Sequence, residues 1–213
     1  MRVCEIFRSI QGESSFMGLP CTFVRLAGCN LRCAWCDTAY AQDPSGGREM
    51  SVHEILREVR ALGTDLVEIT GGEPMLQHDT PNLMHVLLDM GAKVLLETNG
   101  TIDLADVDSR VVVVMDVKAP SSGHADRNRW ENIEALQESD EIKVVLEGRA
   151  DYEWALRELR ARGVIGAKRV TFSPVFGKLD TLTLAEWILK DSVPVKVGLQ
   201  LHKLLWGPDR RGV

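Results

Sequence analysis

Short apolar runs recur along the chain with the length and spacing of buried β-strands. They occupy residues 20–27, 65–70, 93–98, 111–117, 141–146, 168–173 and 194–200. Strands that are buried on both faces, as in a parallel sheet, read as nearly continuous apolar runs rather than as alternating apolar and polar residues. The pattern therefore predicts six or seven parallel strands.

Helical patterns lie between several of these runs. Ser51 and Glu54 form a capping box, and the residues that follow place apolar side chains on one helical face. Thr80 and Pro81 open a second predicted helix, which Gly91 closes. Each of these two helices connects one apolar run to the next, as expected for a βαβ unit.

The second half of the chain has weaker helical signals. Residues 151–162 predict a third helix, and Thr183 with Glu186 predicts the start of a fourth. Residues 99–110 offer little more than a short turn, and residues 119–130 read as an ordered loop. Helices are therefore reduced in this half.

Strands that alternate with helices place the chain in the α/β class. A full (β/α) barrel has about 250 residues, whereas this chain has 213. The expected fold is an incomplete (β/α) barrel with six or seven parallel strands and reduced helices. No repeat, linker or low-complexity segment divides the sequence, so one domain is expected over residues 1–213.

Composition excludes several classes of function. The formal net charge is −6 and no run of Lys and Arg occurs, so the electrostatic footprint of a nucleic-acid-binding protein is missing. No apolar stretch approaches the roughly 18 residues of a membrane span, and the N-terminus lacks the layout of a signal peptide. Five cysteines, three of them clustered, argue against a disulfide framework. A reducing cytoplasm is the expected location.

The cysteines Cys29, Cys33 and Cys36 form a Cys-x3-Cys-x2-Cys array directly after the first apolar run. Three thiolates this close favour a soft metal or an iron–sulfur cluster. A [4Fe–4S] cluster usually has four cysteine ligands, so three would leave one iron open to an exogenous ligand. The alternative is a structural zinc site completed by Cys4 or Cys21.

The chemically unusual segments all follow predicted strands. They are GCNLRCAWCDT (28–38), TGGEPM (70–75), ETNG (97–100), DVKAPSSG (116–123), SPVFGK (173–178) and QLHK (200–203). Any one of them could be ordinary turn chemistry. The carboxyl ends of parallel barrel strands meet at one rim, where such barrels carry their active sites. Six segments at one rim therefore indicate a functional site.

Individual residues within this rim have separate interpretations. Gly71 and Gly72 would expose backbone groups to a ligand such as an amino acid. Arg25 lies inside an apolar strand, where it would either hold a substrate carboxylate or form a structural salt bridge. His202, on the last apolar run, is most simply a core histidine.

The cysteine array followed by GGEP resembles the radical S-adenosylmethionine (SAM) enzymes. Further segments narrow the resemblance to the family of 7-carboxy-7-deazaguanine synthases: EIFRSIQGES, RLAGCNLRCAWCDT, TGGEPMLQ, ETNG, SPVFGK and LQLHK. It extends from residue 5 to the C-terminus. It implies a homodimeric radical SAM lyase of queuosine and 7-deazapurine biosynthesis that receives electrons from a flavodoxin- or ferredoxin-type donor.

The resemblance also implies a reaction. Members of the family convert 6-carboxy-5,6,7,8-tetrahydropterin to 7-carboxy-7-deazaguanine with release of ammonia, after a 5′-deoxyadenosyl radical takes a hydrogen atom from C6. The implied cofactors are a [4Fe–4S] cluster, SAM and Mg²⁺.

The motifs transfer the family's site residues to this sequence. Cys29, Cys33 and Cys36 would bind the cluster, and Thr38 would bind magnesium. The residues implied for SAM are Trp35, Cys36, Asp37, Gly72, Asp116, Val117, Lys118, Ser173, Pro174, Val175 and Phe176. The residues implied for the substrate are Ile10, Gln11, Gly12, Arg25 and Thr70. The sequence departs from the family pattern at Ser14, where glycine is frequent, and in residues 209–213, which follow the position where some members end.

Two other hypotheses compete with this enzyme. A radical SAM activase of glycyl-radical enzymes shares the array and GGEP but would require a surface for docking a protein and further cysteine clusters, and no such cluster is present. A non-catalytic zinc module that binds RNA or protein would require basic patches, which the charge of −6 does not supply.

Overall fold

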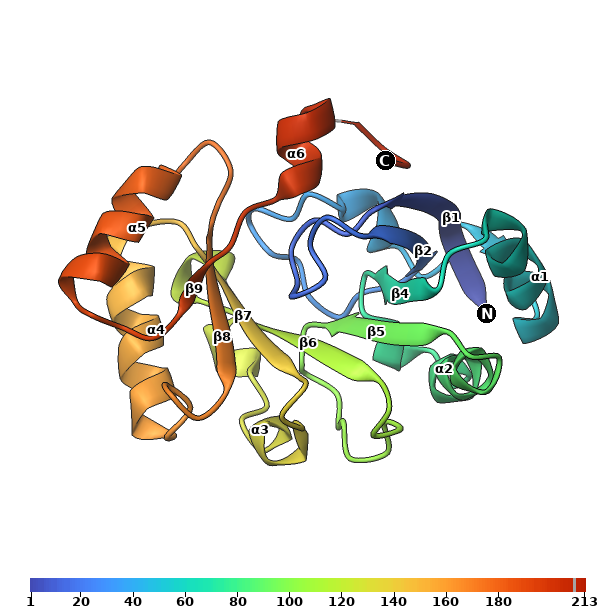
Figure 1. Ribbon diagram of the computed structural model, residues 1–213, viewed down its shortest axis with the longest axis horizontal. Coiled ribbons are helices and arrows are strands. Elements are labelled where there is room, and N and C mark those ends of the chain that lie inside the picture. Colours follow the sequence, from blue (N-terminus) through green and yellow to red (C-terminus); the bar gives the residue numbers. More distant parts are fainter. Residues whose placement is uncertain (209) are drawn as a thin grey trace.

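The computed structural model describes residues 1–208 and 210–213; Asp209, in the C-terminal extension, lies outside them. The described chain contains one nine-stranded sheet with the order β3-β1-β2-β4-β5-β6-β7-β8-β9 (Figure 1). Its strands are β1 (Arg2–Ile10), β2 (Pro20–Leu26), β3 (Arg48–Glu49), β4 (Leu66–Gly71), β5 (Lys93–Thr98), β6 (Val112–Val117), β7 (Glu141–Leu146), β8 (Arg169–Pro174) and β9 (Lys196–Val197).

The seven predicted apolar runs all form strands, and these strands pair in parallel from β2 through β4, β5, β6, β7 and β8 to β9. The open, mostly parallel sheet confirms the incomplete barrel. Two strands were not predicted, namely β1 and β3, which pair antiparallel at one edge. The burial of β1 is irregular, so its sequence mixes charged and apolar residues and contains no apolar run that would predict a strand.

The last predicted strand is wrong in extent. Only Lys196–Val197 of the run 194–200 pairs with β8. Pro194 has no backbone N–H to donate to a ladder. The chain then turns into α6 (Leu201–Trp206), so His202 lies on a helix rather than on a strand.

The helices follow the sequence signals closely. They are α1 (Val52–Leu62), α2 (Thr80–Asp89), α3 (Asn132–Ala135), α4 (Arg149–Ala161), α5 (Thr181–Lys190) and α6. The predicted capping box of Ser51 and Glu54 is present in α1. However, α5 begins earlier than predicted, because Asp180 is its N-cap and accepts a hydrogen bond from the Thr183 N–H at 3.0 Å. The short α3 was not predicted.

The sheet curves into an arch with α1 to α5 on its outer side and α6 above its concave side (Figure 1). Apolar side chains that point outward from the strands pack with these helices into the main core, including Val67, Ile69, Leu96, Val144 and Phe172. A smaller apolar cluster on the same strands contains Cys21, Phe23, Leu66, Leu95 and Val112. These residues alternate with the outward-facing ones, so they form the floor of the concave side. No helix in the described part of the chain is long and apolar enough to cross a membrane.

Candidate active site

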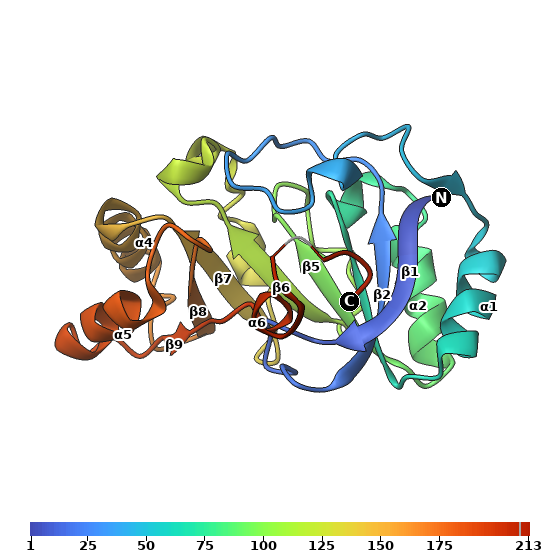
Figure 2. The same ribbon diagram turned by 90° about the horizontal axis from the view of Figure 1, so that it is seen from above.

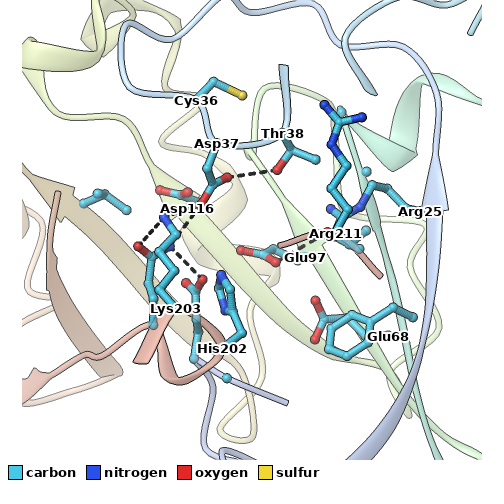
Figure 3. Close-up of a pocket in the computed structure, with 18 of the residues that line it drawn as sticks. Arg25, Cys36, Asp37, Thr38, Glu68, Glu97, Asp116, His202, Lys203 and Arg211 are labelled. Atoms are coloured by element: carbon cyan, nitrogen blue, oxygen red, sulfur yellow. Dashed lines mark hydrogen bonds and ion pairs between the residues drawn. The ribbon is translucent and has the colours of Figure 1, made fainter. Parts of the chain in front are cut away.

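A cavity of about 360 Å³ lies on the concave side of the sheet. Six strands contribute side chains to it: β1, β2, β4, β5, β6 and β7 carry Glu5, Arg25, Thr70, Glu97, Asp116 and Lys143. The loops that follow the strands close the rim, and α6 contributes His202 and Lys203 (Figure 3). The predicted convergence of the strand-end segments is therefore observed for most of them.

The cysteine loop, residues 28–38, leaves the end of β2 through Gly28, whose φ of +95° favours glycine. Cys29, Cys33 and Cys36 are free, half-buried and part of the cavity wall. The Leu31 N–H points at Cys29 Sγ at 3.4 Å. Burial raises the pKa of the Cys29 and Cys33 thiols, and Lys118 opposes this shift. A positively charged iron–sulfur centre would supply the stronger attraction that holds thiolates there.

The arrangement of donors fits a cluster better than a single metal ion. Among the described residues, no three His, Cys, Asp or Glu side chains converge closely enough to hold one ion. Zinc requires four ligands at about 2.0–2.3 Å from one point, whereas the thiolates of an iron–sulfur cluster bind separate irons. Cys21 is buried at the start of β2, roughly 17 Å of extended strand from the rim. It therefore cannot complete a zinc site.

The GGEP loop packs against the cysteine loop through its backbone. A Cβ atom on Gly72 would lie 2.3 Å from the Gly28 carbonyl oxygen and 2.8 Å from Cys29 Cβ, so only glycine fits. Glu73 is fully buried, and its carboxylate accepts hydrogen bonds from the Met75 and Asn99 N–H groups at 2.9 and 2.7 Å. This side chain fixes the loop after β4 to the loop after β5.

Below the rim lies a layer of ionisable side chains on four adjacent strands, which we call the charged layer: Glu68, Glu97, Asp116 and Lys143. Lys143 Nζ contacts Glu97 and lies 2.9 Å from Glu13 Oε2 and 3.8 Å from Asp116 Oδ2. Burial would raise the pKa of Glu97, but Lys143 outweighs it and lowers that pKa to about 2. Burial and the charge of Glu97 raise the pKa of Glu68. Two neighbouring carboxyl groups thus differ in acidity.

Arg25 occupies the side of the cavity formed by β1 and β2. Its Nε donates to Glu5 Oε1 at 2.8 Å, and the Tyr40 hydroxyl donates to the same oxygen at 2.6 Å. Burial and the contact with Glu5 raise the pKa of Tyr40 to about 12, so its hydroxyl stays protonated at neutral pH. The salt-bridge alternative for Arg25 is thus present, but the side chain also faces the cavity.

The opposite side carries Asp37 and Thr38, directly after the cysteines. Thr38 Oγ1 donates to Asp37 Oδ1 at 2.9 Å, and Lys203 Nζ lies 2.7 Å from Asp37 Oδ2 (Figure 3). Burial opposes ionisation of Asp37, but Lys203 outweighs it and holds the pKa well below its usual range. Gln200 Nε2 bridges Glu13 and Asp37 at 3.0 and 3.3 Å, so the start of α6 is tied to the cysteine loop.

Most of the residues expected at the site line this cavity. They are Ile10, Gln11, Gly12, Arg25, Cys29, Cys33, Trp35, Cys36, Asp37, Thr38, Thr70, Gly72, Asp116, Lys118, Val175 and Phe176. Three expected residues are not part of the lining. Val117 packs in the main core, and Ser173 and Pro174 are buried at the end of β8. Ser173 Oγ and Asp116 Oδ1 are buried and have no hydrogen-bond partner among the described residues.

Several lining residues were not expected from the sequence, notably Tyr40, Glu68 and Lys143. A signal existed for two of them, because Glu68 and Lys143 are charges within apolar strands, as Arg25 is. Lys203 also lines the cavity; it belongs to the QLHK segment expected at the rim, although no role was predicted for it. His202, taken for a core histidine, is half-buried and lines the cavity. The QLHK segment was expected at the rim as the end of a strand, but nothing in its local sequence indicates a helix that folds back over the site.

Comparison with known proteins agrees with this geometry. Residues 24–180 match the model of the radical SAM superfamily. A 7-carboxy-7-deazaguanine synthase from Chlorobaculum tepidum is 48% identical over 216 residues, which cover 100% of this chain and 97% of the relative. One from Koribacter versatilis is 47% identical and covers 100% of both chains. The crystal structure of QueE from Escherichia coli superposes with a TM-score of 0.75 at 26% identity and covers 94% of each chain.

The chain is therefore a member of the radical SAM superfamily, whose enzymes use a [4Fe–4S] cluster and SAM. The zinc-module hypothesis has no support in that assignment. The full-length relatives narrow it further: the chain belongs to the 7-carboxy-7-deazaguanine synthase family, within the queuosine pathway. None of the relatives described above is named as an activase.

Proposed function

We propose that the chain converts 6-carboxy-5,6,7,8-tetrahydropterin to 7-carboxy-7-deazaguanine with release of ammonia. The observation that carries this proposal is the cavity itself. Three cysteines and a glycine loop form its rim, and Arg25 with the charged layer forms its wall. Its volume of about 360 Å³ is in the range of sites for small molecules. A polar heterocycle with a carboxylate matches such a lining.

Cys29, Cys33 and Cys36 hold the cluster in this proposal. The cluster and SAM together supply the one-electron chemistry that takes a hydrogen atom from C6 of the substrate. The rim residues position SAM: Trp35, Asp37, Gly72, Lys118 and Phe176 face the cavity. The unpartnered Asp116 Oδ1 supports a ligand on this side, because buried polar atoms normally have partners. The ends of β6 and β8 complete the SAM site through the backbone of Val117, Ser173, Pro174 and Val175.

The wall residues orient the substrate. Arg25 lies within reach of a carboxylate, and guanidinium–carboxylate pairs are strong and directional. Gln11 Nε2 donates to Glu68 Oε2 at 2.9 Å, which fixes the amide at the bottom of the cavity. Ile10 and Gly12 flank it, and Thr70 lies two residues beyond Glu68 on the same face of β4. These residues would hold the heterocycle with C6 toward the rim and exclude water.

Magnesium is part of the proposal through Thr38. Mg²⁺ prefers oxygen ligands and keeps an octahedral shell that includes waters and substrate oxygens. Thr38 Oγ1 and Asp37 Oδ1 lie 2.9 Å apart at the cavity wall. Two oxygens at this position, beside a substrate carboxylate, are a chemically suitable start for such a shell.

The partners follow from the family. We propose a flavodoxin- or ferredoxin-type protein as electron donor, a homodimer as the assembly and the cytoplasm as the location. We also treat residues 1–213 as a single radical SAM domain, because one sheet connects both ends of the described chain.

The direct test is turnover by the reconstituted protein. Anaerobic protein with its cluster, SAM, Mg²⁺ and a reductant should convert the carboxylated tetrahydropterin to a product of the expected mass with one ammonia per product. A matched sample of Cys33→Ala should form none. Wild-type protein that cleaves SAM but leaves the pterin unchanged would refute the proposed substrate.

A further inference from the structure

The segment after α6 returns across the cavity. α6 ends at Trp206, and the φ of +88° at the next residue, Gly207, lets the chain reverse direction. Pro208 and residues 210–213 then line the cavity. Figure 2 shows the C-terminal end of the chain above the middle of the sheet, on its concave side. A segment that the family resemblance did not explain thus forms part of the site.

Arg211 is the residue of this segment that contacts an aromatic side chain of the cavity wall. Its Cζ atom lies 4.0 Å from the centre of the Tyr40 ring. The Tyr40 hydroxyl donates a hydrogen bond to Glu5, which also accepts a hydrogen bond from Arg25. Arg211 therefore lies on the same side of the cavity as Arg25, and Figure 3 shows the two side chains next to each other.

This arrangement leaves a cation without an anionic partner. Arg25 is paired with Glu5, but the Arg211 guanidinium makes no hydrogen bond or ion pair with any described residue. The face of Tyr40 contributes a cation–π contact, which is weak at an exposed position. Two guanidinium groups on one wall repel each other unless an anion lies between them. The wall is thus complementary to a ligand that brings an additional negative charge.

We propose that Arg211 is a second carboxylate-binding residue, which closes over the cavity and, together with Arg25, selects a ligand with a carboxylate. This inference rests on the proposed function, since it assigns a contact to the carboxyl group of the proposed pterin. Arg25 approaches the carboxylate from the wall of the sheet, and Arg211 approaches it from the segment above. Selection then comes from the charge of the substituent rather than from the heterocycle, which both carboxylated and unsubstituted pterins share.

The test is a pair of calorimetric titrations of the anaerobic holoenzyme. One ligand is 6-carboxypterin, an oxidised analogue of the proposed substrate, and the other is pterin without the carboxylate. Arg211→Ala should weaken binding of 6-carboxypterin about ten- to a hundred-fold, as expected for loss of a charge-assisted hydrogen bond, and leave binding of pterin unchanged. Arg211→Lys should recover part of the affinity. Arg157→Ala, which removes an equal charge from the exposed surface of α4, should bind both ligands like the wild type.

The outcomes separate this inference from the proposed function. If Arg211→Ala binds 6-carboxypterin like the wild type, or loses affinity for both ligands equally, Arg211 does not read the carboxylate. The proposed function survives that result if the wild type still forms product. A wild-type protein that neither prefers 6-carboxypterin nor converts the tetrahydropterin would overturn both.

Discussion

The two faces of the central strands differ in chemistry at the level of the charged layer. On β5, Leu96 points outward and is fully buried against the helices, whereas the next residue, Glu97, points into the cavity. On β7, Val144 and Lys143 are related in the same way. Because side chains alternate along a strand, neighbouring residues can serve different purposes: one packs in the core and the next lines the cavity.

The faces also differ in energetic character. Aliphatic burial on the outer face stabilises the fold at about 25 cal/mol per Å². On the inner face, charges removed from water cost free energy unless partners surround them. Lys143 with its three carboxylate neighbours meets that condition. The charged layer is therefore explained by the cavity it lines rather than by a gain in stability.

The largest effect is expected at the rim. Cys33→Ala should abolish cluster binding and with it all turnover, because three thiolates are already one short of the usual four. Iron and sulfide analysis, with the visible spectrum, measures the cluster content. Cys21→Ala, on the floor beneath the cavity, should keep the cluster. A Cys33→Ala protein with full iron content would contradict the assignment.

The comparison of faces is sharpest for the neighbours Leu96 and Glu97. Glu97→Gln should lower kcat/KM about ten- to a hundred-fold, because a charged hydrogen-bonding partner is lost from the cavity. Leu96→Ala should instead destabilise the fold by about 2–5 kcal/mol and leave kcat/KM per folded protein unchanged. Kinetics together with urea unfolding of both variants measures the two quantities.

The contrast between the two faces is contradicted if Leu96→Ala and Glu97→Gln have the same effects on kcat/KM and on the free energy of unfolding. Loss of activity in folded Leu96→Ala would mean that the outer face also controls the geometry of the site. An unchanged kcat/KM in Glu97→Gln would mean that the charge of Glu97 does not contribute to the reaction.

A smaller effect is expected at Thr38. Thr38→Ala should raise the Mg²⁺ concentration needed for half-maximal activity by about tenfold, and Thr38→Ser should restore it because the hydroxyl returns. Magnesium titration of turnover measures the change. An identical dependence in wild type and Thr38→Ala would place the metal elsewhere or exclude a requirement for it.

The ion pair of Glu97 and Lys143 should also make stability depend on pH. The pKa of Glu97 is lowered to about 2, below an unfolded value of about 4.3. Stabilisation by this carboxylate is therefore present above the unfolded pKa and is lost as the pH falls toward the folded pKa. The free energy of unfolding of Glu97→Gln should decline less than that of the wild type between about pH 5 and pH 2. Parallel curves in urea titrations would contradict the shift.

The smallest effect is expected far from the cavity, at the start of α5. Asp180→Ala should cost about 1 kcal/mol, because the carboxylate caps the helix. Glu186→Ala, within the same helix, should cost less, and neither change should alter kcat/KM. Thermal unfolding measures the difference. An equal loss in both variants would show that the cap contributes little.

The strands and the first helices could be predicted because their signals are local. The apolar runs gave all seven parallel strands, and the capping box of Ser51 and Glu54 placed the start of α1. The start of α5 was misplaced, because the spacing of Thr183 and Glu186 was interpreted as the cap, whereas Asp180 caps the helix.

The candidate site could be predicted only where motifs carry it. The cysteine array, the GGEP loop and Arg25 gave most of the rim, and all of them line the cavity. Tyr40 was missed, and Lys203 was expected at the rim but without a role, because both reach the site through tertiary structure. The first lies past the cysteine loop, and the second lies on a helix that folds back from the far end of the chain.

Glu73 has a consequence for how such a protein can change. Its backbone N–H donates to the Gly28 carbonyl at 2.8 Å, while its carboxylate holds Asn99, whose amide in turn donates to Asn30. Three loops that are distant in sequence are thereby joined without any metal. We therefore expect a chimaera that takes its cysteine loop from a distant relative to need the matching loops after β4 and β5 as well.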